Sequence, residues 1–127
     1  MAETANLDRG IGLVLSDDMM FTSRITGTAR ALEVDVKAAR SPDALLTLAG
    51  SERPGCVIVD LGHSGLDISN FIRQLRDTCS PMPRIVAYGS HVDAAALRAA
   101  REAGCDVVLP RSKFVEELPH ALRAWMG

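Results

Sequence analysis

Three aspartates follow short apolar runs of the chain. Asp17 and Asp18 come just after residues 11–15 (IGLVL), and Asp60 comes directly after residues 56–59 (CVIV). Runs of this length are typical of buried strands, and the strands of a parallel sheet end at one edge. Carboxylates gathered there repel one another, and such oxygen ligands suit Mg²⁺. The pattern predicts a metal site, although each aspartate alone could be a turn or cap residue.

Other groups that could contact an anion or a metal fall near the same edge. His63 and His91 lie in predicted loops, where an exposed histidine without a ligand is the simpler interpretation. Arg111, Ser112 and Lys113 place two basic groups and a hydroxyl at the start of the last predicted helix, where an anion would also be attracted by the helix N-terminus. Ser112 could instead act only as the N-cap of that helix, so both interpretations stay open.

Strand-like and helical patterns alternate five times along the chain. The helical stretches carry apolar residues at a spacing of three and four, and Ser41-Pro42 is a typical helix start. The predicted strands are residues 11–15, 34–36, 56–59, 85–88 and 107–109, and the predicted helices are residues 21–32, 42–50, 68–75, 94–103 and 115–125. This alternation predicts an α/β fold: a doubly wound (βα)5 domain with a five-stranded parallel sheet in the order 2-1-3-4-5. Helices should cover both faces, with residues 34–36 as an edge strand.

Composition and charge narrow the function classes. The 127 residues suffice for one domain, which we expect over residues 10–127 after a polar lead of residues 1–9. The net charge of −2 is spread along the chain, which argues against nucleic acid as a partner. No apolar run reaches the roughly 18 residues of a membrane helix, and residues 1–9 lack the order of a secretory signal, so we expect a cytoplasmic protein without a membrane partner. The three cysteines have neither disulfide-framework nor zinc-site spacing.

Two further segments, taken with Asp60, point to a known family. The stretch DLGHSGLD, from Asp60 to Asp67, with the helix after it, is similar to the phosphoacceptor segment of response-regulator receiver domains. Ser16-Asp17-Asp18 resembles the acidic pair of these domains, with Asp17 as either its first or its second member. The segment AGCD at residues 103–106 resembles the one that leads to the invariant lysine of receivers, and that lysine position falls on Arg111.

The resemblance covers about residues 11–126 and implies a flavodoxin-like fold and a set of roles. Asp60 would be the phosphoacceptor, and Ser90 and Arg111 would contact the phosphoryl group. The residues that would hold Mg²⁺ are Asp17, Asp18, Asp60 and, through its carbonyl, Gly62. The sequence departs from the family at the lysine, which is Arg111, and at the switch aromatic, which is Val108. The switch hydroxyl position falls on Tyr88, Gly89 or, with a further slip, Ser90.

These departures shape the expected function. We expect a stand-alone receiver-like signal-transduction module, an atypical or pseudo-receiver that is not an enzyme and acts through contact with a protein partner. The resemblance suggests a histidine kinase or a regulator as that partner and leaves a homodimer open. One alternative is an Mg²⁺-dependent phosphoacceptor that takes a phosphoryl group from a histidine kinase on Asp60. Another is a small-ligand-binding flavodoxin-like module, which a deep apolar cleft at the strand ends would favour.

Overall fold

Strands and helices alternate along the chain in the computed structural model, which describes residues 10–127. The strands are β1 (Gly12–Leu15), β2 (Val36–Ala39), β3 (Cys56–Asp60), β4 (Arg84–Gly89) and β5 (Val107–Pro110). The helices are α2 (Met19–Ala31), α3 (Pro42–Glu52), α4 (Ile68–Thr78), α5 (Ala94–Ala103) and α6 (Arg111–Met126). The lead predicted for residues 1–9 lies outside the described residues.

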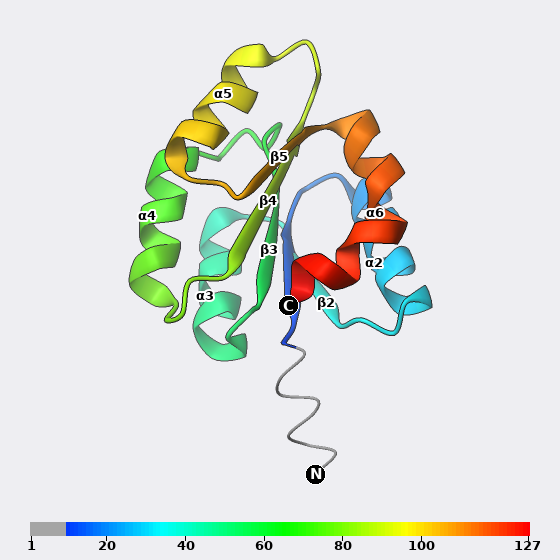
Figure 1. The fold of residues 1–127 in the computed structure, drawn as a ribbon. Helices are drawn as coiled ribbons and strands as arrows, with labels where there is room; N and C mark the ends of the chain where they lie inside the picture. The colour runs from blue at the N-terminus through cyan, green and yellow to red at the C-terminus, as the bar shows by residue number, and fades with distance from the viewer. Residues whose placement is uncertain (1–9) are drawn as a thin grey trace.

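The five strands form one parallel sheet in the order β2-β1-β3-β4-β5, which confirms the predicted topology. Figure 1 shows α3, α4 and α5 on one face of this sheet and α2 and α6 on the other. All strands run in the same direction, so their carboxyl ends meet at one edge, where the loops to the following helices gather. This edge carries the candidate site.

Local side chains fix where most helices begin. Asp18, Ser41, Asp67 and Asp93 each precede a helix and accept a hydrogen bond from a backbone N–H of its first turn. Such N-caps satisfy donors that have no partner within the helix. The predicted start at Ser41-Pro42 and the predicted end of α5 at Gly104, where φ is +100°, are confirmed. Sequence-local chemistry therefore sets these boundaries.

The predicted edge strand at residues 34–36 is misplaced. β2 begins only at Val36, because Val34 closes the turn that follows α2, where its N–H donates to the carbonyl of Ala29. Glu33 adopts a φ of 59° to make that turn. The closing turn of the helix thus takes residues that an alternating pattern assigned to a strand.

Two buried clusters hold the helices against the sheet. Leu13, Val57 and Ile85 pack with α3, α4 and α5 on one face, and Val14, Ile58 and Val86 pack with α2 and α6 on the other. Trp125 and Met126 at the end of α6 belong to the second cluster, so they are core residues. Among the described residues, no helix has the length and apolar character needed to cross a bilayer.

The two outermost strands of the sheet, β2 and β5, are short, with four residues each. β2 carries the exposed Lys37, which pairs with Glu52 of α3. β5 ends in Pro110, which has no N–H to offer a neighbouring strand.

Candidate functional site

Ser16, Asp60 and Tyr88 form a row across the carboxyl edge of the sheet. The strand register pairs Leu15 with Val59 and Asp60 with Tyr88, so the three residues lie on adjacent strands at one level. The residues two positions earlier, Val14, Ile58 and Val86, belong to the buried cluster that packs against α2 and α6. Alternate residues of a strand point to the same face of a sheet. All three side chains are therefore directed to the face covered by α2 and α6.

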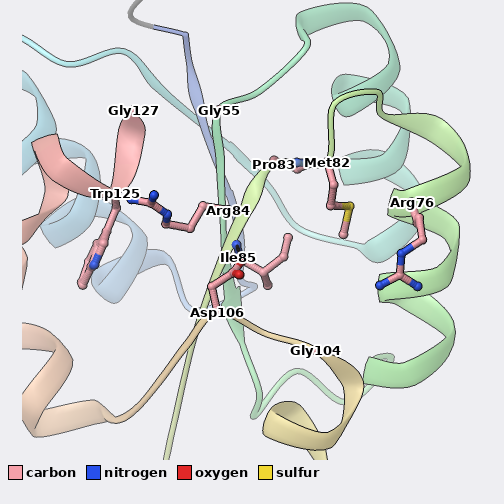
Figure 2. A pocket seen from close by; sticks show the side chains of 10 residues that line it. All are labelled: Gly55, Arg76, Met82, Pro83, Arg84, Ile85, Gly104, Asp106, Trp125 and Gly127. Carbon is pink, nitrogen blue, oxygen red and sulfur yellow. Dashed lines mark hydrogen bonds between the residues drawn. The ribbon is translucent and has the colours of Figure 1, made fainter.

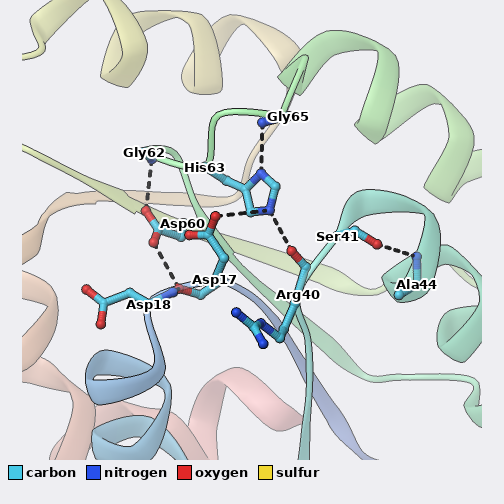
Figure 3. A network of polar contacts seen from close by, with 10 residues as sticks. Asp17, Asp18, Arg40, Ser41, Ala44, Asp60, Gly62, His63 and Gly65 are labelled. Carbon is cyan, nitrogen blue, oxygen red and sulfur yellow. Dashed lines mark hydrogen bonds and ion pairs between the residues drawn. The ribbon is translucent and has the colours of Figure 1, made fainter.

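Asp60 is held by bonds from the chain itself. Its carboxylate is almost fully buried, with 4% of the residue exposed. The hydroxyl of Ser16 donates to Asp60 Oδ2 at 2.9 Å, and the N–H of Gly62 donates to Oδ1 at 2.9 Å. Figure 3 shows the bond to Gly62 and the neighbouring aspartates. Both carboxylate oxygens thus have a donor within the protein.

The three carboxylates do not form the predicted metal cluster. Asp18 is the N-cap of α2 and accepts from the N–H of Phe21, which directs its carboxylate away from Asp60 (Figure 3). The Asp17 side chain is 51% exposed and lies 3.9 Å from the His63 ring. Within residues 10–127, no group of three or more His, Cys, Asp or Glu side chains is arranged to hold a metal ion. Asp18 is therefore a helix cap, the alternative that was left open for an aspartate after a strand.

His63 is buried and its ring connects two loops by hydrogen bonds, so the interpretation as an exposed loop histidine is wrong. Its Nδ1 accepts from the N–H of Gly65 at 3.0 Å, and its Nε2 lies 2.6 Å from the carbonyl oxygen of Arg40. A carbonyl only accepts, so Nε2 carries the proton and donates. Both ring nitrogens are therefore occupied by backbone groups and are not free to bind a metal or a phosphate. His91, by contrast, is exposed as expected.

Tyr88 brings a phenol to the position opposite Asp60. Its ring is fully buried and stacks on Phe114, with 4.6 Å between ring centroids, and lies 4.7 Å from the ring of Phe21. Its hydroxyl makes no well-formed hydrogen bond within the described residues. Burial raises the phenol pKa above its ordinary value, the Asp60 carboxylate raises it further, and contact with the Ser16 hydroxyl opposes both effects. No pattern in the sequence indicates that this hydroxyl would lack a partner.

The structure shows where the residues at the uncertain positions lie. Tyr88 is the β4 residue beside Asp60, Gly89 ends the strand, and Ser90 lies beyond it in the exposed loop. Ser16 and Asp17 directly follow β1, and Ser16 is the one of the two that is bonded to Asp60. Val108 packs in the opposite cluster, against α3, α4 and α5.

Arg111 and Ser90, the predicted phosphate contacts, line one pocket at this edge. The guanidinium carbon of Arg111 lies 5.5 Å from the ring centroid of Phe21, in a cation–π contact. Ser112 is not the N-cap of α6: that position is Pro110, which offers no side-chain acceptor, and Ser112 lies inside the helix. Phe21 of α2, which was predicted only as part of a packing stripe, and Arg24 also line the pocket.

A second pocket, of about 480 Å³, lies at the opposite edge of the sheet (Figure 2). Its polar groups serve the fold. Asp106 accepts from the N–H of Ile85 at 2.7 Å, and Arg84 donates to the carbonyl of Ala124 at 2.8 Å. The chemistry-bearing residues therefore concentrate at the carboxyl edge.

Comparison with known proteins decides what kind of domain carries this edge. The chain is 31% identical over 113 residues to response regulator MprA of Mycolicibacterium vanbaalenii, an alignment that covers 88% of this chain and 48% of the relative. The solved signal receiver domain of a response regulator from Bermanella marisrubri matches with a TM-score of 0.74 and 26% identity, over 91% of this chain and 97% of that one. This chain is a response-regulator receiver domain. No family model matches the sequence.

The receiver domain spans about half the length of the curated relative that it matches. Its fold is also that of a response-regulator structure from Chloroflexus aurantiacus, with a TM-score of 0.78 at 20% identity over 92% of this chain and 97% of that one. This structural match confirms the predicted flavodoxin-like architecture. The relationship to response regulator MprA supports the prediction of a receiver-domain signal-transduction module.

The site of this receiver domain differs from the site that the family resemblance implied. Receiver domains generally bind Mg²⁺ at their acidic site. Here Ser16, the first residue after β1, donates to Asp60, and Asp18 accepts from the N–H of Phe21 at the start of α2. Mg²⁺ in proteins is usually held by one or two carboxylates and several waters. In this structure both oxygens of Asp60 already accept bonds from within the chain, and within residues 10–127 no group of three or more acidic, histidine or cysteine side chains is arranged to hold a metal ion.

Proposed function

We propose that this receiver domain is an atypical one, which signals through contact with a protein partner and without phosphorylation of Asp60. The observation that carries the proposal is the internal bonding of Asp60, whose two carboxylate oxygens accept from Ser16 and Gly62. A phosphoacceptor carboxylate needs an oxygen free to attack and a cation to neutralise the incoming phosphoryl group. Ser16 supplies a neutral hydroxyl where the acidic pair would help to hold that cation.

Exposed apolar side chains at the same edge support contact with a protein. Met20 is 87% exposed and Val92 is 79% exposed, and Met19 beside them is also exposed. The two methionines begin α2, and Val92 lies in the loop between β4 and α5. Apolar groups that gather at one end of a domain are typical of interaction sites. We also propose that the domain acts in the cytoplasm and is not an enzyme.

One observation favours the alternative of a phosphoacceptor. The Arg111 guanidinium lies near the loop after Asp60: a Cβ placed on Gly62 would be 3.2 Å from Asp60 Oδ1 and 3.9 Å from an Arg111 Nη atom. Arginine keeps the positive charge of the family's lysine, in a planar form. A phosphoryl group on Asp60 would therefore meet one cation.

Intact-mass analysis after incubation with acetyl phosphate and Mg²⁺ separates these functions. The proposal expects the wild-type protein and Asp60→Asn to keep the same unmodified mass. A phosphoryl adduct that appears on the wild type and is absent from Asp60→Asn would overturn the proposal and establish the phosphoacceptor. A receiver domain with a complete acidic site, treated in parallel, shows that the phosphodonor is active.

A further inference from the structure

The pocket at the edge of the sheet opposite Asp60 is large enough for a small organic ligand. Its volume is about 480 Å³, and small-molecule sites in proteins usually have volumes of about 300–1,000 Å³. It lies between the end of α4, the start of β4, the turn after α5 and the end of α6 (Figure 2). None of the described residues around Asp60 lines this pocket, so a ligand there would be independent of the Asp60 site.

The charged side chains of this pocket follow one another in a definite order. Figure 2 shows Arg84 on one side and Arg76 on the other, with Asp106 between them. The apolar side chains of Ile85 and Met82 also lie between the two arginines. A ligand that crosses the pocket from Arg84 to Arg76 therefore meets a cation, a carboxylate, an apolar stretch and a second cation.

The fold holds Arg84 and Asp106 in place without using up their capacity to bind. Arg84 donates to the carbonyl of Ala124 at 2.8 Å, and Asp106 Oδ2 accepts from the N–H of Ile85 at 2.7 Å. The guanidinium carries several further N–H donors, and Asp106 Oδ1 has no hydrogen bond to another described residue. Groups that are oriented before a ligand arrives bind it at a smaller entropic cost.

The charged groups of the pocket do not neutralise one another. Among residues 10–127, Arg76, Arg84 and Asp106 take part in no ion pair. Arg76 lies over the turn after α5, where a Cβ placed on Gly104 would be 3.9 Å from an Arg76 Nη atom. Its guanidinium makes no hydrogen bond within the same residues, so it can bind a carboxylate through two parallel bonds. The pocket thus presents unpaired charges of both signs.

We propose that this pocket binds an acidic α-amino acid, with the chemistry of glutamate. The α-carboxylate of the ligand would pair with Arg84, its ammonium group with Asp106 and its side-chain carboxylate with Arg76, while its methylene groups pack on Met82. The order of charges along such a ligand complements the order across the pocket, and its net negative charge offsets the excess of positive charge in the lining. Binding is non-covalent and needs no metal ion. The proposal goes beyond signalling by protein contact and does not depend on it.

The test is a titration of the isotope-labelled full chain with L-glutamate, followed by amide NMR shifts at constant ionic strength. We expect saturable shifts at residues 82–85, 104–107 and 124–127. Arg76→Gln, Arg84→Gln and Asp106→Asn should each weaken binding about tenfold, the usual effect of losing one charge-assisted bond. Arg73→Gln removes an exposed arginine one turn earlier in α4 that does not line the pocket, so this matched control should bind as the wild type does.

Two related ligands separate direct contacts from effects on the fold. Glutarate lacks the ammonium group and L-glutamine lacks the second carboxylate, so each should bind the wild type about tenfold more weakly than L-glutamate does. Asp106→Asn should not weaken glutarate, and Arg76→Gln should not weaken L-glutamine, because the lost charge has no partner on these ligands. Absence of saturable shifts with L-glutamate, equal affinity for all three ligands, or equal weakening by Arg73→Gln and Arg76→Gln would overturn the proposal.

Discussion

Replacing Ser16 by aspartate should turn the internally bonded site into one that responds to Mg²⁺. Ser16 Oγ lies 2.9 Å from Asp60 Oδ2, so Ser16→Asp places a second carboxylate against a buried one. Two like charges about 4 Å apart repel by about 4 kcal/mol at an effective dielectric constant near 20. The variant also loses a hydrogen bond to a charged acceptor, worth about 1.5–3 kcal/mol. Protonation of one carboxylate relieves part of the repulsion, so we expect the free energy of unfolding to fall by about 3–5 kcal/mol.

Urea unfolding followed by the fluorescence of Trp125, the sole tryptophan, measures this loss. Mg²⁺ that binds only the folded state adds about 2.7 kcal/mol when its concentration is 100 times the dissociation constant. Ser16→Asp should recover stability in MgCl2 compared with NaCl of equal ionic strength, whereas the wild type and the neutral, similar-sized Ser16→Asn should not. If the wild type gains as much from Mg²⁺ as Ser16→Asp, or if the aspartate and asparagine variants are equally stable, the reasoning is refuted.

Three other changes test the structure by the same urea assay. Gly27 lies in the exposed middle of α2 with open space around it, so Gly27→Ala should raise the free energy of unfolding by about 0.8–1 kcal/mol. Gly55→Ala should lower it by about 1–3 kcal/mol, because the added Cβ would lie 2.6 Å from the Met126 carbonyl oxygen. Equal effects of the two variants would contradict the packing at the end of α6. His63→Ala should lower the free energy of unfolding by about 2 kcal/mol or more, since two backbone groups lose their hydrogen-bond partner. An unchanged urea midpoint would show that these two bonds are not needed for stability. Burial raises the pKa of the Cys56 thiol to about 12. The contribution of this thiol to the free energy of unfolding should therefore be constant below pH 9 and should then fall by about 1.4 kcal/mol per pH unit. Cys56→Val should reduce that slope.

The sequence predicts the fold well because the fold depends on local periodicity. The strand–helix alternation, the cap at Ser41 and the helix end at Gly104 each follow from residues close in the chain. The boundary of β2 was wrong because Val34 satisfies both an alternating pattern and a helix-closing turn, and its hydrogen bond to Ala29 decides between them.

The site was only partly predictable, because side-chain direction depends on tertiary neighbours. Spacing placed Asp60 at the end of a strand, and that holds. It could not show that Asp18 would turn away to cap α2, or that His63 would meet the carbonyl of Arg40, 23 residues earlier. The unpartnered hydroxyl of Tyr88 likewise depends on the packing of Phe21 and Phe114 around its ring.

The shortness of β2 and β5 bears on how the protein behaves at high concentration. An outermost strand presents unpaired N–H and C=O groups, which can template the addition of a strand from another molecule. β2 offers only four residues and carries the charged Lys37 among them, and β5 stops at a proline. Charge, proline and short length are the features by which natural sheets resist edge-to-edge association. Both edges of the sheet therefore carry features that disfavour the addition of a strand from another molecule: a charged lysine on β2 and a proline at the end of β5.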